Sequence, residues 1–264
     1  MAVTTEMTDE QLEDIFKNEN YLDWCKTIEA RTFNLGVPED DRIIVLVDLC
    51  QVLRGNFELL MRERLTFLAT QYSSKSPVGQ LARYGLAIVF YSQGNVQMGN
   101  KAINALPYTL FCDSIRSRAF LFMVRKGLCL SVAETIKVLL RALEGVPYSV
   151  INANIFKDCV EAVYLAREQK DTQPYLFALP GLILTASGIY QKENASKNRL
   201  AETILLSSRV YYTFGWKKFA LVEARTANKL WEEVFAKEQE CYSNLEEAKD
   251  WLARLRKEGI RLLD

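Results

Sequence analysis

Helical periodicity interrupted by single glycines is the feature that most constrains this chain. Apolar helical runs precede and follow Gly55, Gly94, Gly127 and Gly215. A glycine in such a place can adopt a positive φ and end one helix within a residue or two. Strand signals are weak, because no Asn-Gly or Asp-Gly hairpin turn separates alternating runs. The sequence therefore predicts an all-α protein built from helical hairpins.

Two polar breaks without glycine, at residues 17–20 and 169–171, complete the series of turns. The turn centres then fall near residues 19, 55, 94, 127, 171 and 215, at intervals of about 33 to 44 residues. Intervals of this length are typical of α-solenoids, in which each hairpin buries its apolar face on the next. About six helical hairpins are expected.

The predicted organisation is a single all-helical domain over residues 1–264. An acidic N-terminal hairpin is expected in 1–36, helical repeats in 37–242, and a C-terminal capping helix in 243–264, where apolar residues form one stripe. The alternative is a compact multi-helix bundle. Helix starts are predicted at Thr8, Ser131 and Ser243, each followed by Gln or Glu three residues later, and at Pro38 and Pro77.

Small and aromatic residues stand at set distances from two of the glycines. Around Gly215 these are Ser208, Tyr211, Ala220, Ala224 and Ala227. Around Gly94 they are Ala87, Phe90 and Gly99, with Pro107 after the unit. Two helices that cross closely need small residues at their contact.

This pattern resembles the tetratricopeptide repeat (TPR) family. The units around Gly55 and Gly127 depart from it, because the corresponding positions of their second helices are not small. The resemblance implies a divergent, TPR-like right-handed α-solenoid that binds a peptide or helix of another protein in a concave groove. It also implies which residues line that groove: Arg42, Tyr84, Tyr91, Arg125, Glu202, Arg209 and Tyr212. Arginine and tyrosine are common at protein interfaces, although the tyrosines could equally be core residues with hydrogen-bonded hydroxyls.

The sequence has no histidine, which excludes Ser-His-Asp and Cys-His catalysis and zinc sites of the H-E-x-x-H type. It also has no phosphate-binding glycine loop of the G-x-x-x-x-G-K-[ST] type. We therefore expect a non-enzymatic protein without a cofactor or a metal ion.

Six scattered cysteines, none in a C-x-x-C spacing, are expected to be reduced and mostly buried. The acidic N-terminus has no apolar core typical of a signal peptide. The longest apolar run, 175–190, is too short to cross a membrane and contains Pro180, so a kinked buried helix is expected there. These features favour a soluble, cytoplasmic protein.

Charge gives two further predictions. The 33 basic and 33 acidic residues cancel, which gives no overall support for binding a polyanion. Locally, Arg116, Arg118 and Lys126 could bind an anionic partner, or they could flank a buried helix. The acidic segment 1–24 and the basic segment 114–133 could also attract each other between copies, so self-association is an alternative function. Of the three functions considered, nucleic-acid binding is less favoured than binding of a partner protein or self-association.

Overall fold

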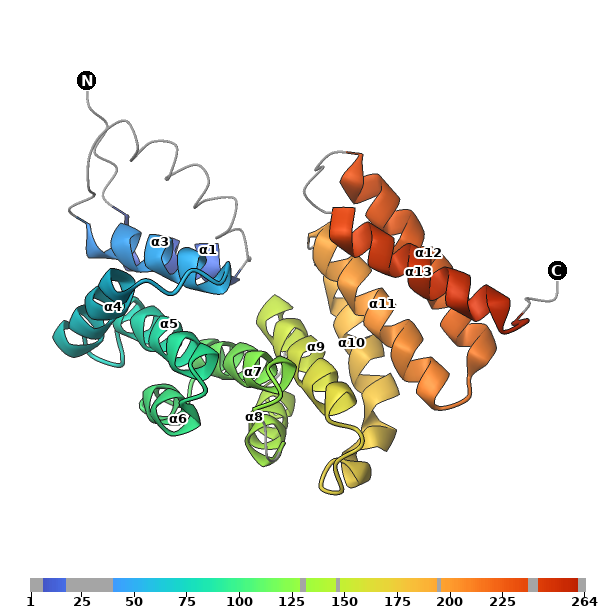
Figure 1. The fold of residues 1–264 in the computed structure, drawn as a ribbon, viewed down its shortest axis with the longest axis horizontal. Coiled ribbons are helices and arrows are strands. Elements are labelled where there is room, and N and C mark those ends of the chain that lie inside the picture. Colours follow the sequence, from blue (N-terminus) through green and yellow to red (C-terminus); the bar gives the residue numbers. More distant parts are fainter. Residues whose placement is uncertain are drawn as a thin grey trace. The chain divides into compact units, whose positions relative to one another are not determined.

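The computed structural model describes residues 7–17, 40–128, 132–145, 148–193, 196–236 and 242–260. Within these residues the chain forms twelve α-helices and one 3-10 helix, and it has no β-strand (Figure 1). The all-α prediction is therefore confirmed. The chain divides into two compact units, Met1–Leu130 and Ser131–Asp264. A solenoid that runs through the chain, and a single domain over 1–264, stay predictions.

The first unit is organised around one buried helix. Its described helices are α1 (Asp9–Lys17), α3 (Asp41–Leu53), α4 (Leu59–Gln71), α5 (Pro77–Ser92), α6 (Val96–Asn104) and α7 (Leu110–Arg125). Helix α5 contacts all five of the others. It is apolar on nearly every side, and all its residues except Arg83, Phe90 and Ser92 are buried. The core of this unit therefore surrounds α5.

In the second unit, each helix packs on its neighbour in the sequence. The elements are α8 (Ala133–Leu143), α9 (Val150–Leu165), the 3-10 helix η1 (Gln173–Ala178), α10 (Leu179–Lys192), α11 (Lys197–Thr213), α12 (Lys217–Phe235) and α13 (Tyr242–Lys257). Helix α13 agrees closely with the helix predicted from residue 243 onward, and it packs against α12 (Figure 1).

The turn glycines behave as predicted. All four have a positive φ: Gly55 (89°), Gly94 (74°), Gly127 (68°) and Gly215 (74°). At Gly215 the N–H of Trp216 donates to the carbonyl of Tyr211, and the N–H of Gly215 donates to the carbonyl of Tyr212, both at 3.0 Å. This is the Schellman arrangement, which satisfies the last carbonyls of a helix. The same pair of bonds occurs at the other three glycines. The predicted turn at 169–171 lies between α9 and η1, whereas residues 18–20 lie outside the described ranges.

The predicted helix starts have mixed outcomes. The N–H of Thr8 donates to Gln11 Oε1 (2.9 Å) and the N–H of Gln11 donates to Thr8 Oγ1 (3.2 Å), so the capping box is confirmed. Pro77 is the first residue of α5, as predicted. The prediction at Ser243 is wrong by a small margin, because α13 already begins at Tyr242. Ser131 and Pro38 lie outside the described residues.

The apolar run 175–190 is not one kinked helix. Residues 173–178 form η1, and α10 then begins at Leu179 with Pro180 in its first turn. A proline is tolerated there because the first N–H groups of a helix have no partner within it. Of the helices in the described ranges, none combines the length and the apolar character needed to cross a membrane.

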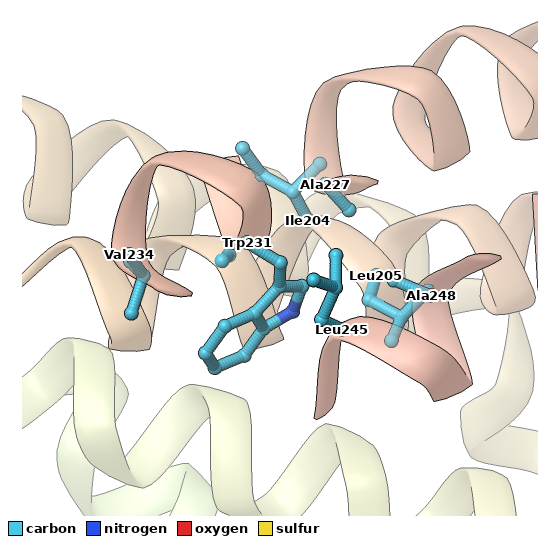
Figure 2. Packing of buried hydrophobic residues seen from close by; sticks show 8 residues of the cluster. Ile204, Leu205, Ala227, Trp231, Val234, Leu245 and Ala248 are labelled. Atoms are coloured by element: carbon cyan, nitrogen blue, oxygen red, sulfur yellow. The ribbon is translucent and has the colours of Figure 1, made fainter. Parts of the chain in front are cut away.

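Close helix contacts explain the small residues. A Cβ atom added to Gly99 would lie 2.3 Å from a ring carbon of Tyr91, so α5 and α6 approach too closely for any side chain. Between α11 and α12, the three alanines Ala220, Ala224 and Ala227 are fully buried. Trp231 lies further along α12 among Ile204, Leu205, Ala227, Val234, Leu245 and Ala248 (Figure 2). The alanine ridge predicted from the sequence is therefore the contact between α11 and α12.

The cysteines differ in part from expectation. Cys112 and Cys159 are buried thiols, as predicted, and burial raises the pKa of Cys112. Cys50 is instead disulfide-bonded, so the expectation of reduced cysteines is wrong at this position. The other three cysteines lie outside the described residues. Sequence spacing could not reveal this bond, because only the fold brings distant thiols together.

Candidate interaction face on helices α11 and α13

Two predicted groove residues on α11 bind side chains of α13 and of the residue that directly follows it. Arg209 Nη2 lies 2.7 Å from Glu247 Oε1, and the hydroxyl of Tyr212 donates to Glu258 Oε2 at 2.7 Å. The hydrogen bond to Glu258 is the main reason why the pKa of Tyr212 is raised. Its phenol therefore stays protonated and able to donate. The side chain of Arg209 keeps 27 % of its surface exposed and that of Glu247 keeps 54 %, so both can still reach a ligand.

Trp251 of α13 lies at the centre of this face. Its indole N–H donates to Ser208 Oγ at 2.8 Å, and its ring stands edge-on to the ring of Tyr212, with centroids 5.4 Å apart. The guanidinium groups of Arg209 and Arg254 lie 5.8 and 5.5 Å from the Trp251 ring centroid. Contacts of this type hold an aromatic ring and two cations in fixed relative positions.

These side chains surround a depression of about 470 Å³. It is lined by Arg209, Ser243, Glu246, Glu247, Asp250, Trp251 and Arg254. Glu246 pairs with Lys249 at 3.1 Å, and Arg254 lies 3.7 Å from Glu258. Asp250, by contrast, makes no ion pair with any described residue. The depression thus offers an aromatic surface next to a carboxylate that can accept a partner's cation.

Glu202, a third predicted groove residue on α11, belongs to a different cluster. Lys157 of α9 is buried, with a side chain only 5 % exposed. Its Nζ lies near three carboxylates: Glu202 at 3.1 Å, Glu161 at 3.4 Å and Asp158 at 3.7 Å. Glu202 also lies 3.4 Å from Arg199. Because breaking a buried ion pair leaves an uncompensated charge, we interpret Glu202 as part of the α9–α11 contact.

A buried tyrosine adjoins this ionic cluster. Tyr190 donates to Asn154 Oδ1 at 2.5 Å, and burial raises the pKa of Tyr190. The hydroxyl of Tyr190 on α10 and the amide of Asn154 on α9 are thus hydrogen-bonded to each other between the two packed helices.

In the first unit, the predicted groove residues do not form one surface. Tyr84 and Tyr91 are buried, and the hydroxyl of Tyr91 donates to Asn100 Oδ1 at 2.7 Å. For Tyr84 and Tyr91, the structure therefore supports the alternative interpretation, that these tyrosines are core residues. Arg42 is partly exposed and pairs with Asp9 at 2.6 Å. Arg125 is exposed at the end of α7.

The predicted anionic-partner patch is divided between interior and surface. Arg116 is buried, pairs with Asp113 at 2.8 Å and donates to the carbonyl of Pro107 at 3.0 Å. Arg118 is also buried. Lys126 is exposed, 5.6 Å from the centroid of the Phe122 ring. Two of the three cations are therefore not at the surface, because α7 packs on that side.

The residues that α13 contributes to this face were not predicted from the sequence. Glu247, Trp251 and Arg254 recur at helical spacing on one face of α13, and Glu258 directly follows the last residue of that helix. That stripe could have been found, but only the fold shows that it faces Arg209 and Tyr212. Among the described residues, no group of three or more cysteines and carboxylates is placed to hold a metal ion.

Comparison with known proteins adds nothing to this description, because no family model, no curated protein and no solved structure matches the chain.

Proposed function

We propose that this chain is a non-enzymatic protein-interaction module that binds a segment of a partner protein on the α11–α13 face. The observation that carries the proposal is the depression in which Trp251 lies between Arg209 and Arg254, with Asp250 at its side. Tryptophan and arginine are the residues most enriched among those that dominate binding energy at protein interfaces.

The charges suggest which segment would fit. Asp250 can accept a lysine or arginine of the partner, since it makes no ion pair within the described chain. An apolar or aromatic side chain next to that cation would cover the exposed part of Trp251. We therefore propose a partner segment with a basic residue beside an apolar one, bound as a helix or as an extended strand.

The repeat architecture is part of the same proposal. Support comes from the four Schellman turns, the alanine ridge on α12 and the contacts of α5 with both α3 and α7. Such helix packing is typical of TPR-like solenoids, whose first helices line a binding surface. Self-association and nucleic-acid binding have less support, because Arg116 and Arg118 of the basic segment 114–133 are buried.

Affinity capture with two matched double variants tests the proposal. Arg209→Ala with Asp250→Lys changes the proposed face, whereas Arg225→Ala with Asp171→Lys makes the same changes at exposed positions elsewhere in the second unit. We expect the first variant to lose a partner that the wild type and the control both retain. Hydrogen exchange of the complex should then show protection in residues 205–213 and 246–258.

Equal capture by both variants, or protection confined to other helices, would contradict this assignment. Tyr91 is unsuitable as a test position, because truncating a buried side chain would damage the core.

A further inference from the structure

The turn between α11 and α12 exposes two large aromatic side chains. Trp216 is 46 % exposed and Phe219 is 66 % exposed. Behind them lies buried Tyr211, whose ring centroid is 5.7 Å from that of Trp216 and 6.2 Å from that of Phe219. Phe214 adds another contact, 5.6 Å from Trp216. The exposed rings are thus held in place by other rings and by the tight turn at Gly215.

Basic residues are concentrated in the two segments that form this tip. Residues 210–222 and 252–260 contain five basic residues and one acid, which gives a net charge of 5 − 1 = +4. The five are Lys217, Lys218, Arg254, Arg256 and Lys257. The two segments meet, because Ile260 packs on the cluster that contains Tyr211 and Leu221. The acid, Glu258, accepts the hydrogen bond of Tyr212 and lies 4.0 Å from Lys217.

Aromatic rings flanked by lysine and arginine suit the boundary between lipid headgroups and acyl chains. Tryptophan is enriched at that depth, and each nearby basic residue is attracted by anionic headgroups. We infer that this tip, formed by the α11–α12 turn and the end of α13, docks on an anionic membrane surface. Trp216 and Phe219 enter the interfacial layer, and the basic residues contact the headgroups. The tip lies on the surface of the bilayer, and no helix of the described ranges has the length and apolar character to cross it.

The positive charge of the tip would also suit a single-stranded nucleic acid, but the arrangement of its aromatic rings would not. Such ligands stack successive bases on open aromatic faces along a groove. Trp216 already has the rings of Tyr211 and Phe214 against it, and Phe219 meets Tyr211 in an edge-on contact. Neighbouring rings therefore already occupy part of Trp216 and part of Phe219, which favours insertion at a lipid surface over the stacking of successive bases.

Vesicle co-sedimentation tests the inference directly. Vesicles of phosphatidylcholine alone are compared with vesicles in which roughly a third of the lipid is phosphatidylserine. We expect the wild type to sediment only with the anionic vesicles. Trp216→Ser with Phe219→Ser should weaken binding by at least roughly tenfold, and Lys217→Gln with Lys218→Gln should also weaken it by roughly tenfold.

Two control variants change similar residues away from the tip. Leu60→Ser with Phe67→Ser removes exposed apolar side chains of α4, and Lys137→Gln with Lys249→Gln removes exposed cations of α8 and α13. Both should bind anionic vesicles as the wild type does. Quenching of tryptophan emission by brominated phosphatidylserine gives a second readout, which Trp216→Phe should largely abolish.

Absence of binding to the anionic vesicles would overturn the inference, as would equal binding to phosphatidylcholine. So would tip variants that bind as tightly as the wild type. Binding of a single-stranded oligonucleotide that depends on Trp216 and Lys217, without vesicle binding, would assign the tip to nucleic acid. Because Arg209 and Asp250 are unchanged in every tip variant, capture of a protein partner on the α11–α13 face is measured independently.

Discussion

The hydroxyl of Ser208 donates a hydrogen bond of 2.6 Å to the backbone carbonyl of Ala220, across the contact between α11 and α12. Ser208 in turn accepts the indole N–H of Trp251 at 2.8 Å, so one hydroxyl connects three helices. Both Ser208 and Ala220 are fully buried. A larger residue at either position would hold the helix axes apart and break this connection.

Ala220→Leu should therefore destabilise the protein. The added atoms have no space at a fully buried contact, so we expect the free energy of unfolding to fall by about 1–3 kcal/mol. Urea denaturation followed by circular dichroism measures this change. Ala253→Leu provides the control, because Ala253 is exposed on α13 and should change stability by less than about 0.5 kcal/mol. Similar effects of the two substitutions would refute the close contact.

Gly99→Ala and Gly188→Ala should change stability in opposite directions. A methyl group at residue 99 would meet the ring of Tyr91 at 2.3 Å, whereas nothing lies within 4 Å of one at residue 188. We expect Gly99→Ala to cost about 1–3 kcal/mol through overpacking. Gly188→Ala should instead stabilise α10 by about 0.4–1 kcal/mol, because alanine loses less backbone entropy. Thermal melts show whether each variant is less or more stable than the wild type. An increase in both melting temperatures would contradict the close approach of α5 and α6.

Trp231→Ala should be among the most damaging substitutions in the second unit. Its side chain is 1 % exposed and lies at the α11–α12–α13 contact (Figure 2). We expect a loss of about 3–5 kcal/mol from the missing contacts and the cavity left behind. The same substitution at Trp216, which is 46 % exposed, should cost less than about 1 kcal/mol. Equilibrium unfolding of both variants checks the difference, and equal losses would mean that the burial of Trp231 is wrong.

Asp48 should make stability depend on pH. Burial raises its pKa in the folded state, although the hydrogen bonds from Arg64 act in the opposite direction. The contribution of Asp48 is therefore fully present below its unfolded pKa of about 3.9 and is lost as pH rises through the higher folded pKa. We expect the wild type to lose stability relative to Asp48→Asn as pH rises from about 4. Urea midpoints across that range measure the difference, and a difference that does not vary with pH would exclude this linkage.

Local sequence determined where four of the helices end. Gly55, Gly94, Gly127 and Gly215 terminate helices because a positive φ and two short-range hydrogen bonds involve only a few consecutive residues. The ridge of alanines after Gly215 was also predictable, since small residues at helical spacing indicate a close crossing. Each of these features depends on residues within one or two turns of each other.

Only the tertiary structure decided which side chains remain at the surface. Tyr91 and Arg116 have residue types common at interfaces, but neighbouring helices cover both, and Asp113 compensates the charge of Arg116. The candidate face instead depends on Trp251 and Asp250, because the fold places α13 beside α11. Exposure depends on which helices pack together, and that packing is determined by contacts between residues far apart in the chain. The sequence therefore determined where the four helices that precede the turn glycines end, and the packing decided which side chains stay exposed.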